Sequence, residues 1–194
     1  ETGMEWGKGD ESKDNPATQR ELDRIDTAFN DVTVVQTLRT VDRWDFDIFT
    51  LAGHSLVGDS PLLIITTHLF NSLGLFEKFS IPLPNFANFI SRIERGYKNN
   101  AYHNRLHAAD VVQNMFFFLR TPSFSEKISP LDVFAALIAA AVHDVGHPGM
   151  FGLTCSQCFH ARAWSKLSSW GLSFCRHEQR VPDPHEFRAR HRVQ

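Results

Sequence analysis

Residues 129–149 read SPLDVFAALIAAAVHDVGHPG, and this stretch decides the fold class. Ser129 suits the N-cap of a helix and Pro130 its first position, and an aspartate follows in the first turn. The run Val133–Val142 is apolar on every side, so this helix is expected to be buried rather than to lie at the surface. It is expected to stop at Gly146, and it therefore leads directly into a cluster of histidine and aspartate.

The segments before this helix show the same helical periodicity. Pro61–Leu75 has apolar residues three and four apart and Gly74 near its end, as expected of an amphipathic helix. The spacing is repeated over residues 86–97, and a further helix is expected over residues 104–120. Trp44–Phe49 alternates apolar and acidic residues, which taken alone suggests a short strand. Helices with short connections and no convincing hairpin predict the all-α class.

The composition is that of a globular chain with one domain. Its 194 residues suffice to bury a core, and 42% of them are hydrophobic and 22% charged. The net charge of −2 gives no overall drive toward nucleic acid or an anionic membrane surface. No run of about 18 apolar residues occurs, so no membrane span is expected. Three cysteines, an odd number, do not make a disulfide framework, which indicates a reducing compartment and predicts a cytoplasmic protein.

The chain is expected to have three parts. Residues 1–40 would hold a flexible leader of about 20 residues and a first helix, because the leader has too few apolar side chains to offset its ordering entropy. Residues 41–150 contain the helices and the motifs. Residues 151–194 differ in texture and are expected to form a partly disordered tail. A zinc knuckle from Cys155, Cys158, His160, Cys175 and His177 is an alternative there, although the second pair is spaced too tightly for the usual finger.

Two clusters of histidine and aspartate contain the candidate chemistry. His103 and His107 are four residues apart, so at the start of a helix they project from one face, with Asp110 a turn further on. His143 and Asp144 are adjacent at the end of the apolar helix, where they can hold one divalent ion and the carboxylate can bridge to a second. Two ions about 4 Å apart can activate a phosphoryl group, while a separate histidine protonates the leaving oxygen. A lone histidine at a helix end is more often a capped or surface residue than a ligand, but two clusters together indicate a helical metallohydrolase.

The chain resembles the class I cyclic nucleotide phosphodiesterases, a branch of the HD-domain phosphohydrolases, in two motifs. Residues 102–111 read YHNRLHAADV and residues 143–149 read HDVGHPG. Three further stretches look like that family, and they are Trp44–Phe49, Lys78–Pro82 and Phe134–Ala140. The resemblance runs from about Val41 to Met150 and implies a phosphodiesterase-like helical bundle. It also implies that Trp44–Phe49 belongs to a helical subdomain rather than to a strand.

The resemblance implies a role for each motif residue. His107, His143 and Asp144 would be metal ligands, with Asp144 bridging zinc and magnesium (or manganese). His103 would be the general acid that protonates the departing 3′-oxygen of a cyclic nucleotide.

The same resemblance places further residues around the ligands. His147 would hydrogen-bond water on the second ion, and Asp110 would also lie outside the direct ligands. Tyr102 would line the substrate pocket, and Asn104 would support the motif loop. The family commonly has an acidic residue where this sequence has Gly146, which removes one outer carboxylate but no direct ligand.

The resulting expectation is hydrolysis of a 3′,5′-cyclic nucleotide to the 5′-monophosphate, with cyclic AMP favoured over cyclic GMP and no nucleic-acid partner. Another HD-type phosphohydrolase is an alternative, against which the motif at residues 102–104 argues. The family's further aspartate ligand, its Glu-His-His segment and its purine clamp are not identified after Met150. A second alternative is therefore a truncated, catalytically impaired form that has weak activity or none, and that serves only as an interaction module or is degraded.

Overall fold

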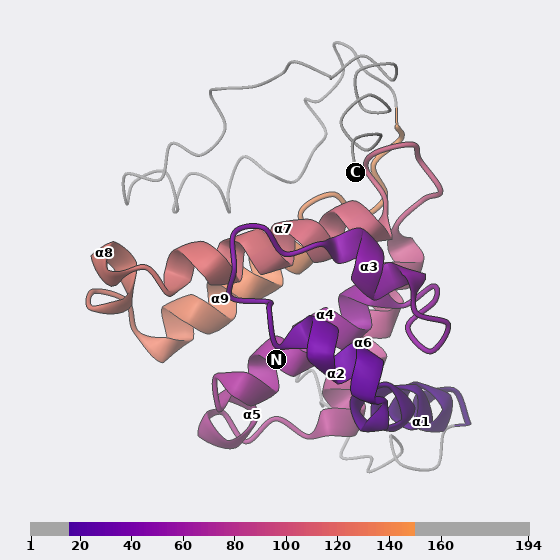
Figure 1. Ribbon diagram of the computed structural model, residues 1–194, viewed down its shortest axis with the longest axis horizontal. Coiled ribbons are helices and arrows are strands. Elements are labelled where there is room, and N and C mark those ends of the chain that lie inside the picture. The colour runs from indigo at the N-terminus through magenta and orange to yellow at the C-terminus, as the bar shows by residue number, and fades with distance from the viewer. Residues whose placement is uncertain (1–15, 150–194) are drawn as a thin grey trace, which may run out of the picture. The chain divides into compact units, whose positions relative to one another are not determined.

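The computed structural model describes residues 16–149, and its structure is all-α over that range, as predicted. Figure 1 shows the helices crossing one another around a shared core. The nine helices of the described residues are α1 (Pro16–Asn30), α2 (Val32–Leu38), α3 (Ile48–Gly53), α4 (Pro61–Ser72), α5 (Leu75–Lys78), α6 (Leu83–Gly96), α7 (Arg105–Leu119), α8 (Pro122–Ser125) and α9 (Pro130–Val142). No helix within this range is both long and apolar enough to cross a membrane.

The strand suggested by the alternation in Trp44–Phe49 is wrong, and the helical assignment from the resemblance is correct. The acidic residues of this stretch have local roles. Asp45 pairs with Arg43 at 2.8 Å in a turn. Asp47 is the N-cap of α3, and its carboxylate accepts hydrogen bonds from the backbone N–H groups of Phe49 and Thr50. The alternation therefore reflects a turn followed by a helix cap.

The first helix begins earlier than the composition indicates. α1 starts at Pro16, so the last residues of the expected leader are helical. Thr18, Ile25 and Ala28 form its buried face. Only one side of α1 is apolar, and its first turn is mostly polar. The apolar periodicity that predicts a helix is therefore not visible at its start.

The burial of two helices is the reverse of the sequence prediction. α4 was expected to be amphipathic, yet nine of its twelve residues are buried, because α1, α6, α7 and α9 all pack against it. α9 was expected to be buried on every side, yet its buried residues form one face, and Leu131 is 60% exposed. Hydrophobic content alone does not determine which apolar helix occupies the centre of a fold.

Helices α7 and α9 lie side by side and position the candidate site (Figure 1). Both bring small residues to their buried faces, Ala108 and Ala109 on α7 and Ala136 and Ala140 on α9. Small side chains permit a close approach of two helices. The start of α7 lies beside the end of α9, and the two histidine and aspartate clusters meet there.

Candidate metal centre

The two clusters are held by the ends of two helices. Asn104 is the N-cap of α7, and its side-chain oxygen accepts hydrogen bonds from the backbone N–H groups of Leu106 and His107 at 2.9 and 3.0 Å. The cap fixes the first turn of α7, from which His107 projects. His143 is the C-cap residue of α9, and Asp144 follows it.

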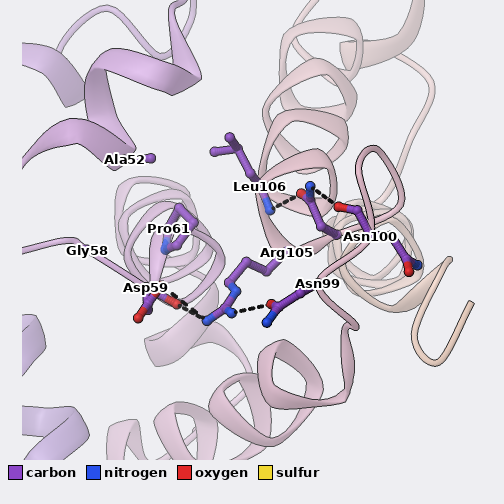
Figure 2. A pocket seen from close by; sticks show the side chains of 9 residues that line it. Ala52, Gly58, Asp59, Pro61, Asn99, Asn100, Arg105 and Leu106 are labelled. Carbon is purple, nitrogen blue, oxygen red and sulfur yellow. Dashed lines mark hydrogen bonds and ion pairs between the residues drawn. The ribbon is translucent and has the colours of Figure 1, made fainter. Parts of the chain in front are cut away.

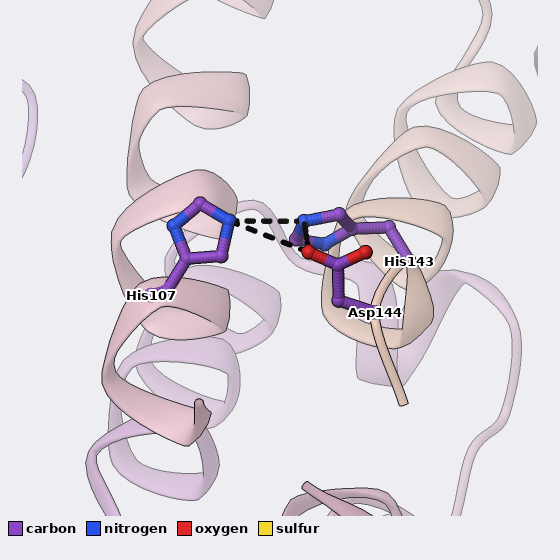
Figure 3. Close-up of side chains that lie close together, drawn as sticks. All are labelled: His107, His143 and Asp144. Carbon is purple, nitrogen blue, oxygen red and sulfur yellow. Dashed lines mark hydrogen bonds and ion pairs between the residues drawn. The ribbon is translucent and has the colours of Figure 1, made fainter. Parts of the chain in front are cut away.

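The expected ligand atoms of these residues converge (Figure 3). Nε2 of His143 lies 3.2 Å from Nε2 of His107 and 3.1 Å from Oδ2 of Asp144. Nε2 of His107 lies 3.6 Å from the same carboxylate oxygen. Ligand atoms bound to one tetrahedral ion at 2.0–2.1 Å are about 3.3 Å from one another. The three residues therefore fit a single divalent metal ion.

The imidazole of His143 is also oriented for ligation. Its Nδ1 lies 2.8 Å from the carbonyl oxygen of Ala140, and because a carbonyl only accepts, Nδ1 carries the hydrogen. In the neutral ring Nε2 then has a lone pair directed at His107 and Asp144. Hydrogen bonds of this kind, from the far nitrogen of a histidine ligand to a backbone carbonyl, are common around metals in proteins.

The electrostatics keep the carboxylate ionised. Burial alone would raise the pKa of Asp144, yet hydrogen bonds from His107 and His143 hold that pKa well below its usual range. Burial alone would lower the pKa of His143, but the adjacent Asp144 raises it. The cluster thus concentrates negative charge at the point where the ligand atoms meet, which favours a cation.

His103 and His147 lie at the edge of the ligand group. Nε2 of His103 is 3.9 Å from Oδ2 of Asp144, and its ring stacks on that of His147 with centroids 4.0 Å apart. Burial and the neighbouring His147 lower the pKa of His103. The backbone N–H of Gly149 donates to Nδ1 of His147 at 3.1 Å, which leaves the Nε2 hydrogen of His147 as a donor.

The other predicted site residues lie at different distances from the ligands. The ring of Tyr102 lies against that of His107, with centroids 4.4 Å apart, and the side chain is 57% exposed. Asp110 is on α7, outside the ligand group, and burial raises its pKa. Besides capping α7, Asn104 donates to the carbonyl of Asn100 at 3.0 Å.

Two residues that the sequence placed in a helix and a turn contact the site directly. The buried hydroxyl of Tyr97 donates to the carbonyl of Ala141 at 2.9 Å and lies 3.4 Å from the backbone N–H of Asp144. Burial raises the pKa of Tyr97, so this hydroxyl keeps its proton. The amide of Asn100 donates to the carbonyls of His103 and His147 at 3.1 and 2.9 Å. The only feature of the sequence that could have pointed to Tyr97 and Asn100 as site residues is that they closely precede the first motif.

A cavity of about 290 Å³ adjoins the first motif but is separate from the ligand group (Figure 2). Arg105 crosses it, donating to the carbonyl of Asp59 at 3.1 Å and to the side chain of Asn99 at 3.0 Å. None of the three ligand residues lines it. The cavity is therefore bordered by residues 99–105 of the first motif and the segment before it, and it is not the metal centre.

Comparison with known proteins connects this geometry to a family. The model of the family described as 3′5′-cyclic nucleotide phosphodiesterase matches residues 102–167. The human dual specificity calcium/calmodulin-dependent 3′,5′-cyclic nucleotide phosphodiesterase 1C is 36% identical over 118 residues, which are 60% of this chain and 16% of that protein. The 3′,5′-cyclic-AMP phosphodiesterase, isoform F, of Drosophila melanogaster is 40% identical over 114 residues, which are 58% of this chain and 17% of that protein.

The chain thus spans about a sixth of the length of these curated relatives. The matched range of the family continues past Met150, beyond the described residues. The expected tail at 151–194 and its cysteines also lie outside them. Helical architecture, convergent ligands and sequence identity agree, and the chain is similar to the N-terminal part of a class I 3′,5′-cyclic nucleotide phosphodiesterase catalytic domain.

Proposed function

We propose that this protein hydrolyses a 3′,5′-cyclic nucleotide to the 5′-monophosphate, with cyclic AMP favoured over cyclic GMP. The observation that carries the proposal is the convergence of His107, His143 and Asp144, with ligand atoms 3.1–3.6 Å apart, beside a further histidine. The preference for cyclic AMP is supported by the identity to a relative named as a cyclic-AMP phosphodiesterase. The human relative, named as dual specificity, makes cyclic GMP the comparison substrate.

His107, His143 and Asp144 would hold zinc, and Asp144 would also bind a second ion, magnesium or manganese. When bound, such ions supply Lewis-acid activation of a phosphoryl group. The carboxylate of Asp144 is suited to this task because its lowered pKa keeps it ionised. His147 would orient water at the second ion through its Nε2 hydrogen.

His103 would donate the proton that the departing 3′-oxygen takes up. Its Nε2 lies 3.9 Å from Asp144, close enough to the ligand group to reach a phosphodiester held there, while it is outside the group of three ligands. The lowered pKa of His103 makes its protonated form the stronger acid. A positioned acid of this kind contributes about 10²–10⁴-fold in rate. Tyr102, beside His107, would line the nucleotide pocket.

The test is hydrolysis of both nucleotides by the purified chain with zinc and magnesium, with and without a chelator. We expect slow, metal-dependent turnover, faster with cyclic AMP, that is abolished in Asp144→Asn and reduced about 10²-fold or more in His103→Ala. His54→Ala is the matched control, because this imidazole contacts threonines of α2 instead of the ligand group. Metal-dependent product from neither nucleotide would contradict the proposal. Robust turnover would contradict the prediction that the chain by itself is impaired.

The cytoplasmic location and the absence of a nucleic-acid partner stay predictions from the sequence. Fractionation of cells that express a tagged chain would test the location. An electrophoretic shift assay with random-sequence DNA and RNA would test the second prediction.

A further inference from the structure

The segment that follows α6 makes direct contact with the turn that carries His143 and Asp144. Tyr97 is the C-cap residue of α6 and is 5% exposed. Its hydroxyl donates to the carbonyl of Ala141 at 2.9 Å and lies 3.4 Å from the backbone N–H of Asp144. One side-chain oxygen thus contacts the backbone on both sides of His143.

The hydroxyl of Tyr97 supplies one of the hydrogen-bond partners of the last turn of α9. The final carbonyls of a helix lack partners within it and need others. The carbonyl of Ala140 accepts from the ring of His143, that of Ala141 from the hydroxyl of Tyr97, and that of Val142 from the N–H of Val145. Of these three hydrogen-bond donors, the hydroxyl of Tyr97 is the one that belongs to another element, the C-cap of α6. It therefore fixes where the end of α9 lies relative to α6.

A close backbone approach reinforces this connection. The carbonyl of Gly96 accepts from the N–H of Gly146 at 3.1 Å. A Cβ atom at position 96 would lie only 2.8 Å from Cγ1 of Val145, so the side chain of Val145 in the turn would have to shift. Gly96 and Tyr97 together fix the turn over residues 143–146 from one side.

We propose that Tyr97 is a positioning residue for the metal centre, whose hydroxyl sets the orientation of His143 and Asp144 and thereby the affinity for a divalent ion. The inference rests on the ligand assignment of the proposed function. Removing the hydroxyl leaves a buried carbonyl without its donor, and the last turn of α9 relaxes toward another partner. Loss of groups that orient metal ligands typically lowers metal affinity by about 10–100-fold.

The experiment is a titration of the purified chain with Co²⁺, followed by visible absorption and by competition with Zn²⁺. We expect the wild-type chain to bind Co²⁺ and His143→Ala to lose the absorption band. Tyr97→Phe should keep the stoichiometry but bind about 10-fold more weakly. Gln113→Met is the matched control, since it removes a buried hydrogen bond of α7 to the carbonyl of Val41 and a partly buried one to that of Arg43, without touching the site.

A second pair of variants tests the neighbouring approach of Gly96 to the same turn and leaves the hydroxyl of Tyr97 in place. Gly96→Ala should lower the affinity for Co²⁺, because its new methyl group presses on the side chain of Val145, which belongs to the turn. The double variant Gly96→Ala/Val145→Ala should restore much of the affinity. If Tyr97→Phe does not fold, this pair still tests whether the segment at residues 96–97 positions the turn, and unchanged affinity in Gly96→Ala would contradict the proposal.

Several outcomes would overturn the proposal. Unchanged Co²⁺ affinity in Tyr97→Phe, or an equal loss in Gln113→Met, would show that the hydroxyl has no specific role in positioning. Absence of the band in the wild-type chain would overturn the metal centre and this proposal together. A chain that binds Co²⁺ in the expected order but hydrolyses no cyclic nucleotide would contradict only the proposed function.

Discussion

Nε2 of His107 and Nε2 of His143 lie 3.2 Å apart, although the two histidines are 36 positions apart in the sequence. Nδ1 of His143 donates to the carbonyl of Ala140, so in the neutral ring Nε2 of His143 has only a lone pair. Without a cation, a proton on Nε2 of one of the two histidines must fill this contact. A metal ion would take the place of that proton and would also bind Asp144.

The first prediction follows from this exchange of a proton for an ion. Zn²⁺ at 100 times its dissociation constant should raise the free energy of unfolding by about 2.7 kcal/mol, because it binds the folded chain. Urea unfolding with Zn²⁺ and with a chelator measures the difference. His107→Ala should show much less stabilisation, while His68→Gln, which alters a histidine of α4 packed against Phe29, should respond like the wild type. Equal stabilisation of His107→Ala would contradict the ligand assignment.

The second prediction concerns the amide of Asn100, which joins the backbones of the two motifs. Asn100→Asp places a carboxylate opposite the carbonyls of His103 and His147, where two hydrogen bonds were donated. We expect a loss of about 1–3 kcal/mol in unfolding free energy, the usual cost of unsatisfied buried groups. Asn114→Asp is the control, because its amide bonds within its own helix, to the carbonyl and the carboxyl of Asp110. A similar loss in both variants would argue against a bridging role.

The third prediction is a pH dependence that originates at Glu94. This carboxyl is 4% exposed and accepts a hydrogen bond from the backbone N–H of Leu62 at 2.8 Å, at the start of α4. Burial raises the pKa of Glu94 from 4.5 to about 8. Between these pH values the folded chain binds more protons than the unfolded chain, so the stability falls as the pH rises, by at most about 1.4 kcal/mol per unit. Below pH 4.5 the contribution is fully present, and above pH 8 it is lost.

Glu94→Gln keeps an acceptor for the N–H of Leu62 but has no titratable proton. The difference in unfolding free energy between this variant and the wild type should therefore grow from pH 5 to pH 8. Urea unfolding at several pH values measures it. A difference that stays constant with pH would show that Glu94 titrates normally.

The fourth prediction tests the stretch that decides the fold class. Ser129 and Asp132 form a reciprocal capping box, in which each side chain accepts from the backbone N–H of the other residue. Ser129→Ala should destabilise the chain by about 1 kcal/mol. Ser123→Ala, an exposed position on α8, should change stability by less than about 0.5 kcal/mol. Thermal unfolding of both variants gives the comparison, and equal melting temperatures would refute the importance of the cap.

Local interactions explain why much of the fold was predictable. The start of α9 is fixed by Ser129 and Pro130, and the end of α4 by Gly74, whose φ of 64° suits glycine. The strand suggested for Trp44–Phe49 was wrong because an N-cap aspartate and an ion-paired aspartate produce the same alternation as a strand. An alternation of apolar and acidic residues over six positions does not distinguish a strand from a turn followed by a helix cap.

The sequence by itself determined the all-α class and the identity of the candidate ligands, because helix caps, periodicity and the two motifs are properties of contiguous residues. Only the tertiary structure decided that α4 is central while α9 presents one buried face. It alone brought His107 to His143, and Tyr97 to the turn that holds Asp144. These relationships depend on how distant helices pack, and the packing of each helix depends on all its neighbours at once.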